Sequence, residues 1–372
     1  MKVLLTTPNL NKAGGVANYY ATLKDHFNSE VEYFTVGSRT VDEKSVHKLI
    51  RLLKDYSRFY RILKSGRYDL VHLNPSLRPK ALLRDSIFLA MAKLRRKKTI
   101  IHFRGWRWDW EHVIRRYFRF LFRAVYFRAN AFIVQSITFK DALQSMDCKK
   151  LIFIEPTVVS NEAISYAERL MLSRMSVSSP TRFNVLFLTR IEKSKGIYES
   201  VKAYQILKAK YPFITMTVAG DGSELANVKD YVSKKGIENI EFLGWVTGES
   251  KHKAFASADV YLFYSWSEGM PNSVLEAMAF GLPIVTRPVG GIVDLFGKGR
   301  IGFMTQSEKP EDFALLLEKF ILNPELGLEI GKENYLLAVK NFSASTVAKR
   351  LRRIYANVLR GEECPQEWGS PS

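Results

Sequence analysis

The chain has 372 residues, 47% of them hydrophobic and 25% charged, with a formal net charge of +19. This length and composition are those of a globular protein with room for two hydrophobic cores, and no run approaches the roughly 18 apolar residues of a membrane-spanning helix. Two cysteines without metal-ligand spacing, Cys148 and Cys364, argue against a disulfide framework and for a reducing compartment. The apolar run at the N-terminus is too short for a signal peptide.

The first half of the chain predicts one parallel sheet. Short apolar runs alternate there with helical segments, which is the pattern of βαβ units. The expected strands are Lys2–Thr6, Val31–Phe34, Leu70–Leu73, Thr99–Phe103, Ala131–Gln135 and Leu151–Ile154.

The basic excess is also concentrated in the first half. Residues 1–172 contain 31 Lys/Arg and 15 Asp/Glu, so they carry +16 of the total charge of +19. Residues 93–128 hold twelve cations against two acids, with aromatic residues between them. Wound as one helix, Trp110–Phe127 puts its arginines on one face and Ile114, Tyr117 and Leu121 on the opposite face, against a sheet. Arginine and tryptophan near a surface favour contact with an anionic membrane.

The second half repeats the alternating pattern and predicts a second parallel sheet. Its expected strands are Asn184–Leu188, Thr215–Ala219, Ile240–Phe242, Val260–Phe263 and Pro283–Thr286. A Ser-rich segment without periodicity separates the two halves. We therefore expect a first domain at residues 1–172, a linker at 173–182, a second domain at 183–344, a final helix at 345–360 and a tail at 361–372.

The stretch from Ser265 to Pro283 is the most informative part of the second half. Glu268 and Glu276 bracket a Gly-Met-Pro-Asn-Ser turn that leads into a helix, with Asn272 or Ser273 as its expected cap and Gly281 as its end. Eight residues of helix rise roughly 12 Å, too far for the paired carboxylates of a glycosidase. The pair instead suits the two ends of an elongated ligand whose phosphate meets the helix N-terminus.

Two cations are expected beside this stretch. Arg190 and Lys195 follow the strand Asn184–Leu188, and ligands of open α/β sheets bind at the carboxyl ends of the strands. There they could neutralise a departing diphosphate. Without the neighbouring motifs, a solvated basic loop is the simpler interpretation.

The first half offers weaker signals. Gly14 and Gly15 follow the first strand, where a backbone without side chains could approach a diphosphate or simply form a turn. His102 ends the strand Thr99–Phe103, where a histidine is as often structural as functional. The chain has no Asp-x-Asp pair to hold a divalent ion, so we expect no metal.

Together with Gly220-Asp221-Gly222 and the run Pro288–Asp294, these motifs resemble the donor-site signature of family-4 retaining glycosyltransferases (glycosyltransferase group 1). The resemblance extends over nearly the whole chain. It implies an α/β fold of the GT-B type, with two Rossmann-like doubly wound domains facing a cleft and a last helix that crosses back to the first domain.

The resemblance also implies a role for each candidate residue. Glu276 would accept hydrogen bonds from the ribose hydroxyls, and Glu268 would meet hydroxyls of the transferred sugar. Arg190 and Lys195 would hold the diphosphate, and His102 would face the reacting sugar. The sugar and phosphate pocket would be lined by the backbone of Gly269, Met270, Pro271 and Asn272, with Gly14 and Gly15 near the diphosphate.

The expected activity is transfer of a sugar, with retention and without metal or other cofactor, from a UDP- or GDP-sugar to a lipid-linked saccharide or glycolipid of a bacterial-type surface polysaccharide. The expected place is the cytoplasmic face of the cell membrane. Thr189, Asp294 and the segment Glu155–Val159 depart from the family pattern, and the donor base and sugar stay open. Two alternatives remain: a basic nucleic-acid-binding protein and a catalytically silent GT-B partner subunit.

Overall fold

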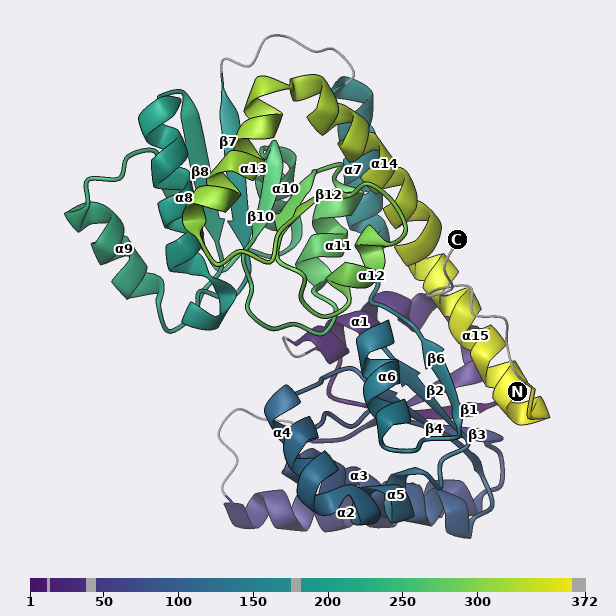
Figure 1. The fold of residues 1–372 in the computed structure, drawn as a ribbon. Coiled ribbons are helices and arrows are strands. Elements are labelled where there is room, and N and C mark those ends of the chain that lie inside the picture. Colours follow the sequence, from purple (N-terminus) through teal and green to yellow (C-terminus); the bar gives the residue numbers. More distant parts are fainter. Residues whose placement is uncertain (12–13, 38–44, 175–181, 363–372) are drawn as a thin grey trace. The chain divides into compact units, whose positions relative to one another are not determined.

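The computed structural model describes residues 1–11, 14–37, 45–174 and 182–362. The chain forms two compact units. The first unit comprises Met1–Thr157 together with Ala344–Ser372, and the second comprises Val158–Ser343. Each unit contains one six-stranded sheet in which all paired strands are parallel (Figure 1).

The sheet of the first unit has the strand order β2-β1-β3-β4-β5-β6. The order reverses at β1, because β2 lies on one side of it and the later strands follow on the other. Its strands are β1 Val3–Thr7, β2 Val31–Thr35, β3 Leu70–Leu73, β4 Lys98–Phe103, β5 Ala131–Val134 and β6 Leu151–Ile154.

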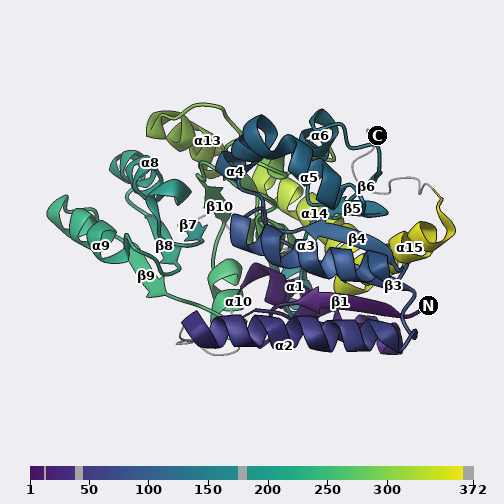
Figure 2. The same ribbon diagram turned by 90° about the horizontal axis from the view of Figure 1, so that it is seen from below.

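Helices cover both faces of this sheet. Helices α2 (Ser45–Lys64), α3 (Pro79–Leu94) and α5 (Arg119–Tyr126) lie side by side on one face, whereas α1 (Gly15–Leu23) and α15 (Ala344–Arg360) pack together on the other (Figures 1 and 2). The remaining helical segments of the first unit are η1 Lys24–His26, η2 Asn28–Glu30, α4 Trp108–Val113, η3 Ile114–Phe118 and α6 Ile137–Ser145.

The sheet of the second unit has the order β12-β11-β10-β7-β8-β9, so its order reverses between β7 and β10. Its strands are β7 Phe183–Leu188, β8 Ile214–Ala219, β9 Ile240–Gly244, β10 Val260–Phe263, β11 Ile284–Thr286 and β12 Gly302–Met304. Its helical segments are α7 Asn161–Arg174, η4 Lys193–Lys195, α8 Ile197–Lys210, α9 Leu225–Lys234, α10 Gly248–Ala256, α11 Asn272–Ala279, α12 Ile292–Phe296, α13 Pro310–Leu322 and α14 Pro324–Phe342.

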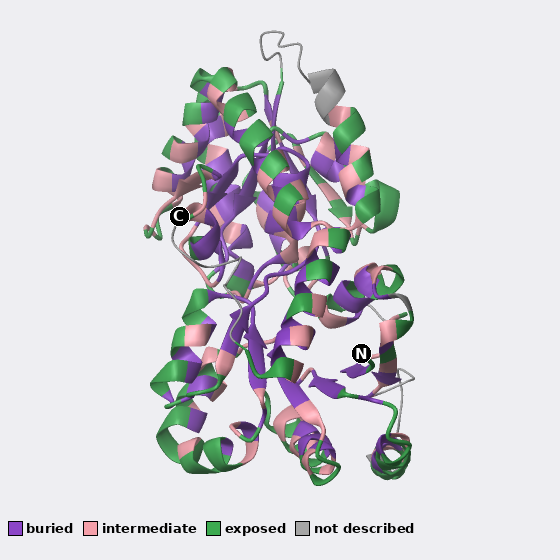
Figure 3. Ribbon diagram, turned by 90° about the vertical axis from the view of Figure 1, so that its right-hand side faces the viewer, coloured by how far each residue is buried: buried purple, intermediate pink, exposed green. Residues whose placement is uncertain are grey.

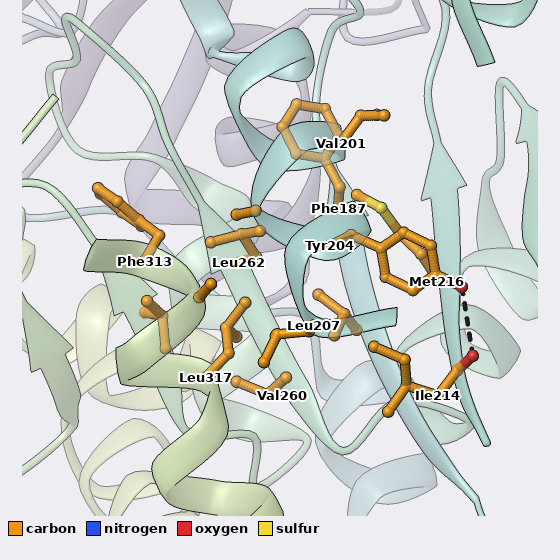
Figure 4. Packing of buried hydrophobic residues seen from close by; sticks show 14 of the residues in the cluster. Phe187, Val201, Tyr204, Leu207, Ile214, Met216, Val260, Leu262, Phe313 and Leu317 are labelled. Carbon is orange, nitrogen blue, oxygen red and sulfur yellow. Dashed lines mark hydrogen bonds between the residues drawn. The ribbon is translucent and has the colours of Figure 1, made fainter. Parts of the chain in front are cut away.

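The core of the second unit lies between the sheet and the helices α8 and α13. Tyr204 and Leu207 of α8 and Phe313 and Leu317 of α13 pack there with Leu262 of β10, all of them buried (Figure 4). In both units the strands are buried and the exposed residues lie mainly on helices and loops (Figure 3). Each buried sheet is thus a rigid scaffold, and functional residues are expected mainly on the loops that the sheet positions.

All eleven expected strands are present, each displaced by no more than two residues at an end. The sequence reasoning missed the edge strand β12, because its three residues are only half-buried and form no apolar run. The division between the units falls after Thr157 rather than at residue 172. Helix α7 belongs to the second unit because Tyr166 packs against His252 of α10 and Phe280 beside α11. Most of the expected linker, residues 175–181, lies outside the described residues.

The expected single helix Trp110–Phe127 is wrong. A π-helical turn, η3, separates α4 from α5. A π-turn inserts about one residue relative to an α-helix and so rotates everything after it. As a result Phe122 and Tyr126 are buried, while Tyr117 and Leu121, expected to face the sheet, are exposed.

No helix in the described part of the chain is both long enough and apolar enough to cross a membrane. Cys148 is a buried free thiol, and Cys364 lies outside the described residues.

Candidate active site

The reversal of strand order in the second unit brings two predicted loops together. In a doubly wound sheet the loops after the two central strands diverge at the carboxyl edge and leave a ligand site between them. Here these are the loops after β7 and β10. The backbone N–H of Trp266 donates a hydrogen bond to the carbonyl of Ser194 at 3.0 Å and so links one loop to the other.

Lys195 and Glu268 meet at this link. The Nζ of Lys195 lies 2.5 Å from Oε1 of Glu268, and the hydroxyl of Ser265 donates to the same oxygen at 2.9 Å. Lys195 is 7% exposed, so the pair is largely withdrawn from water. Removing either partner would leave an uncompensated charge in a poorly solvated place. The sequence predicted both residues and did not predict their ion pair.

Arg190 lies on the same loop in a more open position. Its guanidinium pairs with Glu192 at 2.6 Å while 61% of the side chain stays exposed. The turn Gly220-Asp221-Gly222 supports this loop, because the N–H of Ile191 donates to the carbonyl of Asp221 at 2.9 Å. The Gly-Asp-Gly motif therefore shapes the loop that carries Arg190.

Glu276 has a cationic partner of its own. It lies on α11, and the Nζ of Lys251 on α10 is 2.7 Å from its Oε1. Sequence reasoning missed Lys251, because it lies 25 residues away and only the packing of α10 beside α11 reveals it. The two glutamates thus have separate lysines, and each lysine neutralises one end of the predicted stretch.

The start of α11 differs from the expectation. The helix begins at Asn272, Pro271 is the N-cap residue, and no side chain caps the helix. Capping by Asn272 or Ser273 is therefore wrong. Glu268 precedes the helix, so the roughly 12 Å of helical rise does not describe the spacing of the two glutamates. The end agrees: Gly281 has φ +68° and accompanies the paired backbone bonds of a Schellman motif.

The turn Gly269–Asn272 rests on the second glycine-rich segment of the family signature. The N–H of Gly291 donates to the carbonyl of Gly269 at 2.7 Å. A Cβ on Gly290, which has φ +53°, would lie 2.3 Å from the same carbonyl, so only glycine fits there. Met270 is buried. Close backbone packing thus fixes the shape of the predicted sugar and phosphate turn.

A further cation, Arg287, follows β11 at the same edge of the sheet. Its guanidinium stacks over the ring of Trp266 at 4.1 Å, and its Nη2 lies 3.4 Å from Glu308. Sequence reasoning missed Arg287 and Ser265. The only available signal was their position within two residues of the end of a predicted strand.

Gly14, Gly15 and His102 belong to the first unit. Gly14 precedes α1, and its carbonyl accepts the first helical hydrogen bond, from Asn18 at 2.9 Å. This places the glycines after β1, where the strand order of the first sheet reverses. Residues 12 and 13 of that loop lie outside the described residues.

His102 is fully buried in β4. Its Nδ1 lies 3.1 Å from the hydroxyl of Tyr20, and its Nε2 has no hydrogen-bond partner. Burial, with the nearby positive charge of Arg104, holds the pKa of His102 well below its usual value, so the ring is neutral. Among the described residues, no group of three or more His, Cys, Asp or Glu side chains is placed to hold a metal ion.

Comparison with known proteins assigns part of the second unit to a protein family. Residues 173–336 match the family described as Glycosyl transferases group 1. An uncharacterized glycosyltransferase of Haemophilus influenzae is 29% identical over 182 residues, which are 48% of this chain and 51% of that protein. A D-inositol 3-phosphate glycosyltransferase of Paenarthrobacter aurescens is 35% identical over 145 residues, 37% of this chain and 35% of that protein. The chain spans about half or less of the curated relatives it matches.

Solved structures resemble the whole chain. The crystal structure of Anabaena Alr3699/HepE in complex with UDP aligns with 96% of this chain, at a TM-score of 0.70 and 19% identity. The alignment includes 100% of the Anabaena chain. A glycosyltransferase from Rickettsia africae covers 96% of this chain, with 98% of its own chain covered, at a TM-score of 0.73 and 18% identity. At this level of identity the likeness establishes a shared fold.

Proposed function

Residues 173–336 make this chain a member of the group 1 glycosyltransferases, built on the GT-B fold, and from that premise we propose that it transfers a sugar from a nucleotide-sugar to an acceptor hydroxyl. The observation that carries the proposal is the pair Lys195–Glu268 at the reversal of strand order in the second sheet. This is the position where doubly wound sheets bind nucleotides.

The donor proposed is a UDP- or GDP-sugar. The diphosphate needs positive charge, and Lys195, Arg190 and the N-terminal end of α11 supply it. Glu268 meets hydroxyls of the transferred sugar, and Glu276 meets those of the ribose. UDP is the first nucleotide to test, because the Anabaena protein of the same fold has been crystallised with UDP and with UDP-glucose.

The proposed transfer proceeds with retention and needs no resident metal or other cofactor. The bond between the anomeric carbon and the phosphate oxygen breaks, and the acceptor oxygen bonds to the same face of that carbon. The acceptor proton passes to the departing phosphate. Lys195 and Arg190 stabilise the negative charge that develops on this phosphate in the transition state.

The acceptor proposed is a lipid-linked saccharide or glycolipid used in a surface polysaccharide such as O-antigen, capsule or exopolysaccharide. One of the relatives, 25% identical over 183 residues, is the capsular polysaccharide biosynthesis glycosyltransferase CapM of Staphylococcus aureus. The proposal places the protein in the cytoplasm, at the inner face of the membrane.

The support for this location is one surface of the first unit. Helices α2, α3 and α5 lie side by side (Figure 2), and each exposes large apolar side chains. On α3, Leu83, Ile87 and Leu94 recur at helical spacing on one face, and Phe120 and Leu121 of α5 are 86% and 59% exposed. We call these exposed side chains, with Leu49 and Leu53 of α2, the α2–α3–α5 surface.

Cations surround this surface. Helix α2 alone has six Lys/Arg and one acid within residues 45–64. Apolar side chains flanked by arginine and lysine fit the headgroup region of an anionic bilayer, where each cation near the surface contributes about 1 kcal/mol. A nucleic acid would use the cations and leave the aliphatic leucines exposed to water.

Donor binding is tested by thermal unfolding of the full chain with UDP, GDP and a panel of nucleotide-sugars. A ligand at 100 times its Kd stabilises the folded state by about 2.7 kcal/mol. We expect one nucleotide to raise Tm, Lys195→Met to abolish the rise and Lys210→Met to preserve it. Lys210 is the matched control, because it also pairs with a glutamate of the second unit, Glu318. No response to any nucleotide-sugar would defeat the donor assignment.

Slow hydrolysis of the stabilising donor separates an enzyme from a silent partner subunit. We expect wild-type protein to hydrolyse that donor and Glu268→Gln to lose the activity. Binding without hydrolysis, or without transfer to any lipid-linked acceptor, would favour the silent subunit.

Membrane association is tested by flotation with vesicles of phosphatidylcholine alone and with added phosphatidylglycerol. We expect flotation only with the anionic vesicles, and its loss in the double variant Phe120→Ser/Leu121→Ser. The matched control is Leu322→Ser/Leu336→Ser, which removes two exposed leucines from the second unit. If the protein stays in the bottom fraction with anionic vesicles but shifts RNA or DNA in a gel, the membrane proposal fails and the nucleic-acid alternative gains.

A further inference from the structure

Four cations gather at the amino ends of the strands of the first sheet, at the edge opposite the loop that follows β1. They are Lys93 near the end of α3, Lys98 at the start of β4, Arg128 before β5 and Lys150 before β6. The strands β4, β5 and β6 are neighbours in parallel register, with Ala131 of β5 opposite Ile100 and Leu151. Their amino ends therefore lie side by side, with roughly 5 Å between adjacent strands. We call these four residues the amino-edge cluster.

The tip of Lys93 is held in place within the amino-edge cluster. Its Nζ donates a hydrogen bond to Oδ1 of Asn130 at 2.7 Å, and the backbone N–H of Thr99 donates to the same oxygen at 2.9 Å. The backbone N–H of Asn130 in turn donates to the carbonyl of Thr99 at 2.9 Å. Lys93 is half-buried and the adjacent Leu94 is exposed. The amine is thus ordered by β4 and β5 and still reached by solvent.

The charges that act on Lys93 are all positive. They belong to Lys150, Lys98 and Arg128. The acid that follows α6, Asp147, pairs instead with Arg119 and Arg123 of α5. Burial, with the three positive charges, lowers the pKa of Lys93 to about 8. At pH 7.5 about a quarter of the molecules therefore carry Lys93 as a neutral amine.

A neutral amine beside three cations combines two properties that one reaction needs. Its lone pair makes it a nucleophile, as in the desolvated lysines of enzymes, and the cations attract a reagent that carries a phosphate. An ordinary lysine, with a pKa near 10.4, has only about 0.1% of its amine neutral at pH 7.5. The lower basicity offsets part of this gain, by a slope of about 0.4–0.5 in the case of thiols, so we expect about a tenfold excess in reactivity to remain.

We propose that Lys93 is a site of covalent modification, whose amine takes the acyl group of an acyl phosphate drawn to the amino-edge cluster. Nζ forms a bond to the acyl carbon, the bond from that carbon to the phosphate oxygen breaks, and inorganic phosphate leaves. The proton that the nitrogen loses passes to water. The amide formed is uncharged, so the reaction removes the repulsion around Lys93. The inference uses residues of the first unit alone and does not rest on the proposed function.

The test uses acetyl phosphate with the full chain, and mass spectrometry after cleavage at glutamate measures the acetylated fraction of each lysine. We expect Lys93 to react about ten times faster than Lys149 at pH 7.5, and its rate to level off above about pH 8. Lys149 is the internal reference, because it is exposed and adjoins the cluster without being one of the charges that lower the pKa of Lys93. A Lys93 rate no higher than that of Lys149, or one still rising tenfold per pH unit at pH 9, would overturn the inference.

Two variants test the part played by the cluster. Lys150→Met removes one of the charges acting on Lys93 and should slow acetylation of Lys93 at pH 7.5 several-fold. Lys149→Met is the matched control, because it makes the same change of charge one residue away, and it should leave the Lys93 rate unchanged. Equal losses in the two variants would assign the reactivity to net charge in general and overturn the role of the cluster.

A second reagent tests the attraction of phosphate. N-acetoxysuccinimide transfers the same acetyl group and carries no charge. We expect the preference for Lys93 over Lys149 to be larger with acetyl phosphate than with this neutral reagent, and the difference to disappear at 0.5 M salt. The same preference with both reagents at low salt would overturn the assignment of an acyl phosphate.

Discussion

Each unit reverses strand order within its parallel sheet, at β1 in the first unit and between β7 and β10 in the second, and the two units place different chemistry on and beside these strands. The second unit uses charges in opposed pairs, Lys195 with Glu268 and Lys251 with Glu276. The first unit uses a neutral network of histidine, tyrosine and asparagine, and its large net charge lies elsewhere, in its helices and loops. Charge pairs suit an anionic ligand that must be neutralised, whereas a neutral network suits a hydroxyl that must be oriented.

The largest expected effect is on the charged side of this comparison. Glu268→Gln leaves Lys195 without its counter-charge in a site that is 7% exposed, and it removes the predicted sugar contact. Breaking a buried pair costs about 3–5 kcal/mol of unfolding free energy. Because the lost sugar contact and the uncompensated Lys195 also act on the transition state, kcat/KM for the donor should fall by about two to three orders of magnitude, which is roughly 3–4 kcal/mol of activation free energy. Steady-state kinetics measure it. Glu318→Gln, which breaks the pair with Lys210, should leave kcat/KM within about twofold of wild type, and a similar loss there would end the special role of Glu268.

The neutral side should respond to acid. His72 and His102 have pKa values below those of an unfolded chain, where histidine titrates near 6.5. The unfolded state therefore binds more protons below that pH, and stability falls as pH decreases from about 6.5, by up to roughly 1.4 kcal/mol per pH unit for each histidine. The charge that acts on both histidines is that of Arg104, which lowers both pKa values further.

Hydrogen exchange of the β3 and β4 amides at pH 7.5 and 5.5 measures this loss. His72→Gln should show a smaller decrease in protection between the two pH values than wild-type protein. An equal decrease in both proteins would mean that other groups cause the acid sensitivity.

Lys251→Met compares the two lysine–glutamate pairs of the second unit. It removes the cation beside Glu276 and leaves the Lys195–Glu268 pair intact. Because Lys251 is about a quarter exposed, water compensates part of the loss, and we expect roughly a tenfold weaker nucleotide Kd. Isothermal titration with the preferred nucleotide measures it. The control is Lys253→Met on the same helix. Lys253 pairs with the exposed Glu249, and its loss should leave the nucleotide Kd unchanged.

The smallest effect is expected at the outer helices of the first unit. Asp147 pairs with both Arg119 and Arg123, and all three side chains are more than 40% exposed. Asp147→Asn should cost less than about 1 kcal/mol of unfolding free energy, and less still at 0.5 M salt. Urea unfolding at two salt concentrations measures it. A loss above 2 kcal/mol would show that this arginine cluster is structural.

The buried strands were predictable because each is a short apolar run bounded by polar residues, as in β3 and β10. The pairing of Lys195 with Glu268 was within reach, since both follow strands that the topology places together. Lys251 was not, because its position depends on how α10 packs beside α11. The π-helical turn η3 was also not predictable from the sequence, because a regular helix and a helix with one inserted residue have the same kind of amino-acid composition.

The hydrogen-bonded group of Tyr20, His72, Asn74, His102 and Tyr355 shows a different limit. Asn74 lies just after β3 and the other four lie on α1, β3, β4 and α15, and His72 and Tyr355 are 283 positions apart. Each one alone looks like an ordinary core residue, so its meaning emerges only when the tertiary structure joins them.

Helix α15 has a consequence for how the protein is made. The first unit takes Met1–Thr157 and then Ala344–Ser372, with the whole second unit between them. A ribosome adds about 5–20 residues per second from the N-terminus, so Tyr355 emerges only after the second unit is complete. Until then Nδ1 of His72 lacks its hydrogen-bond partner, the hydroxyl of Tyr355, and the face of the first sheet that α15 covers stays open. A nascent chain stalled just after Ser343 would expose this face to chaperones and proteases.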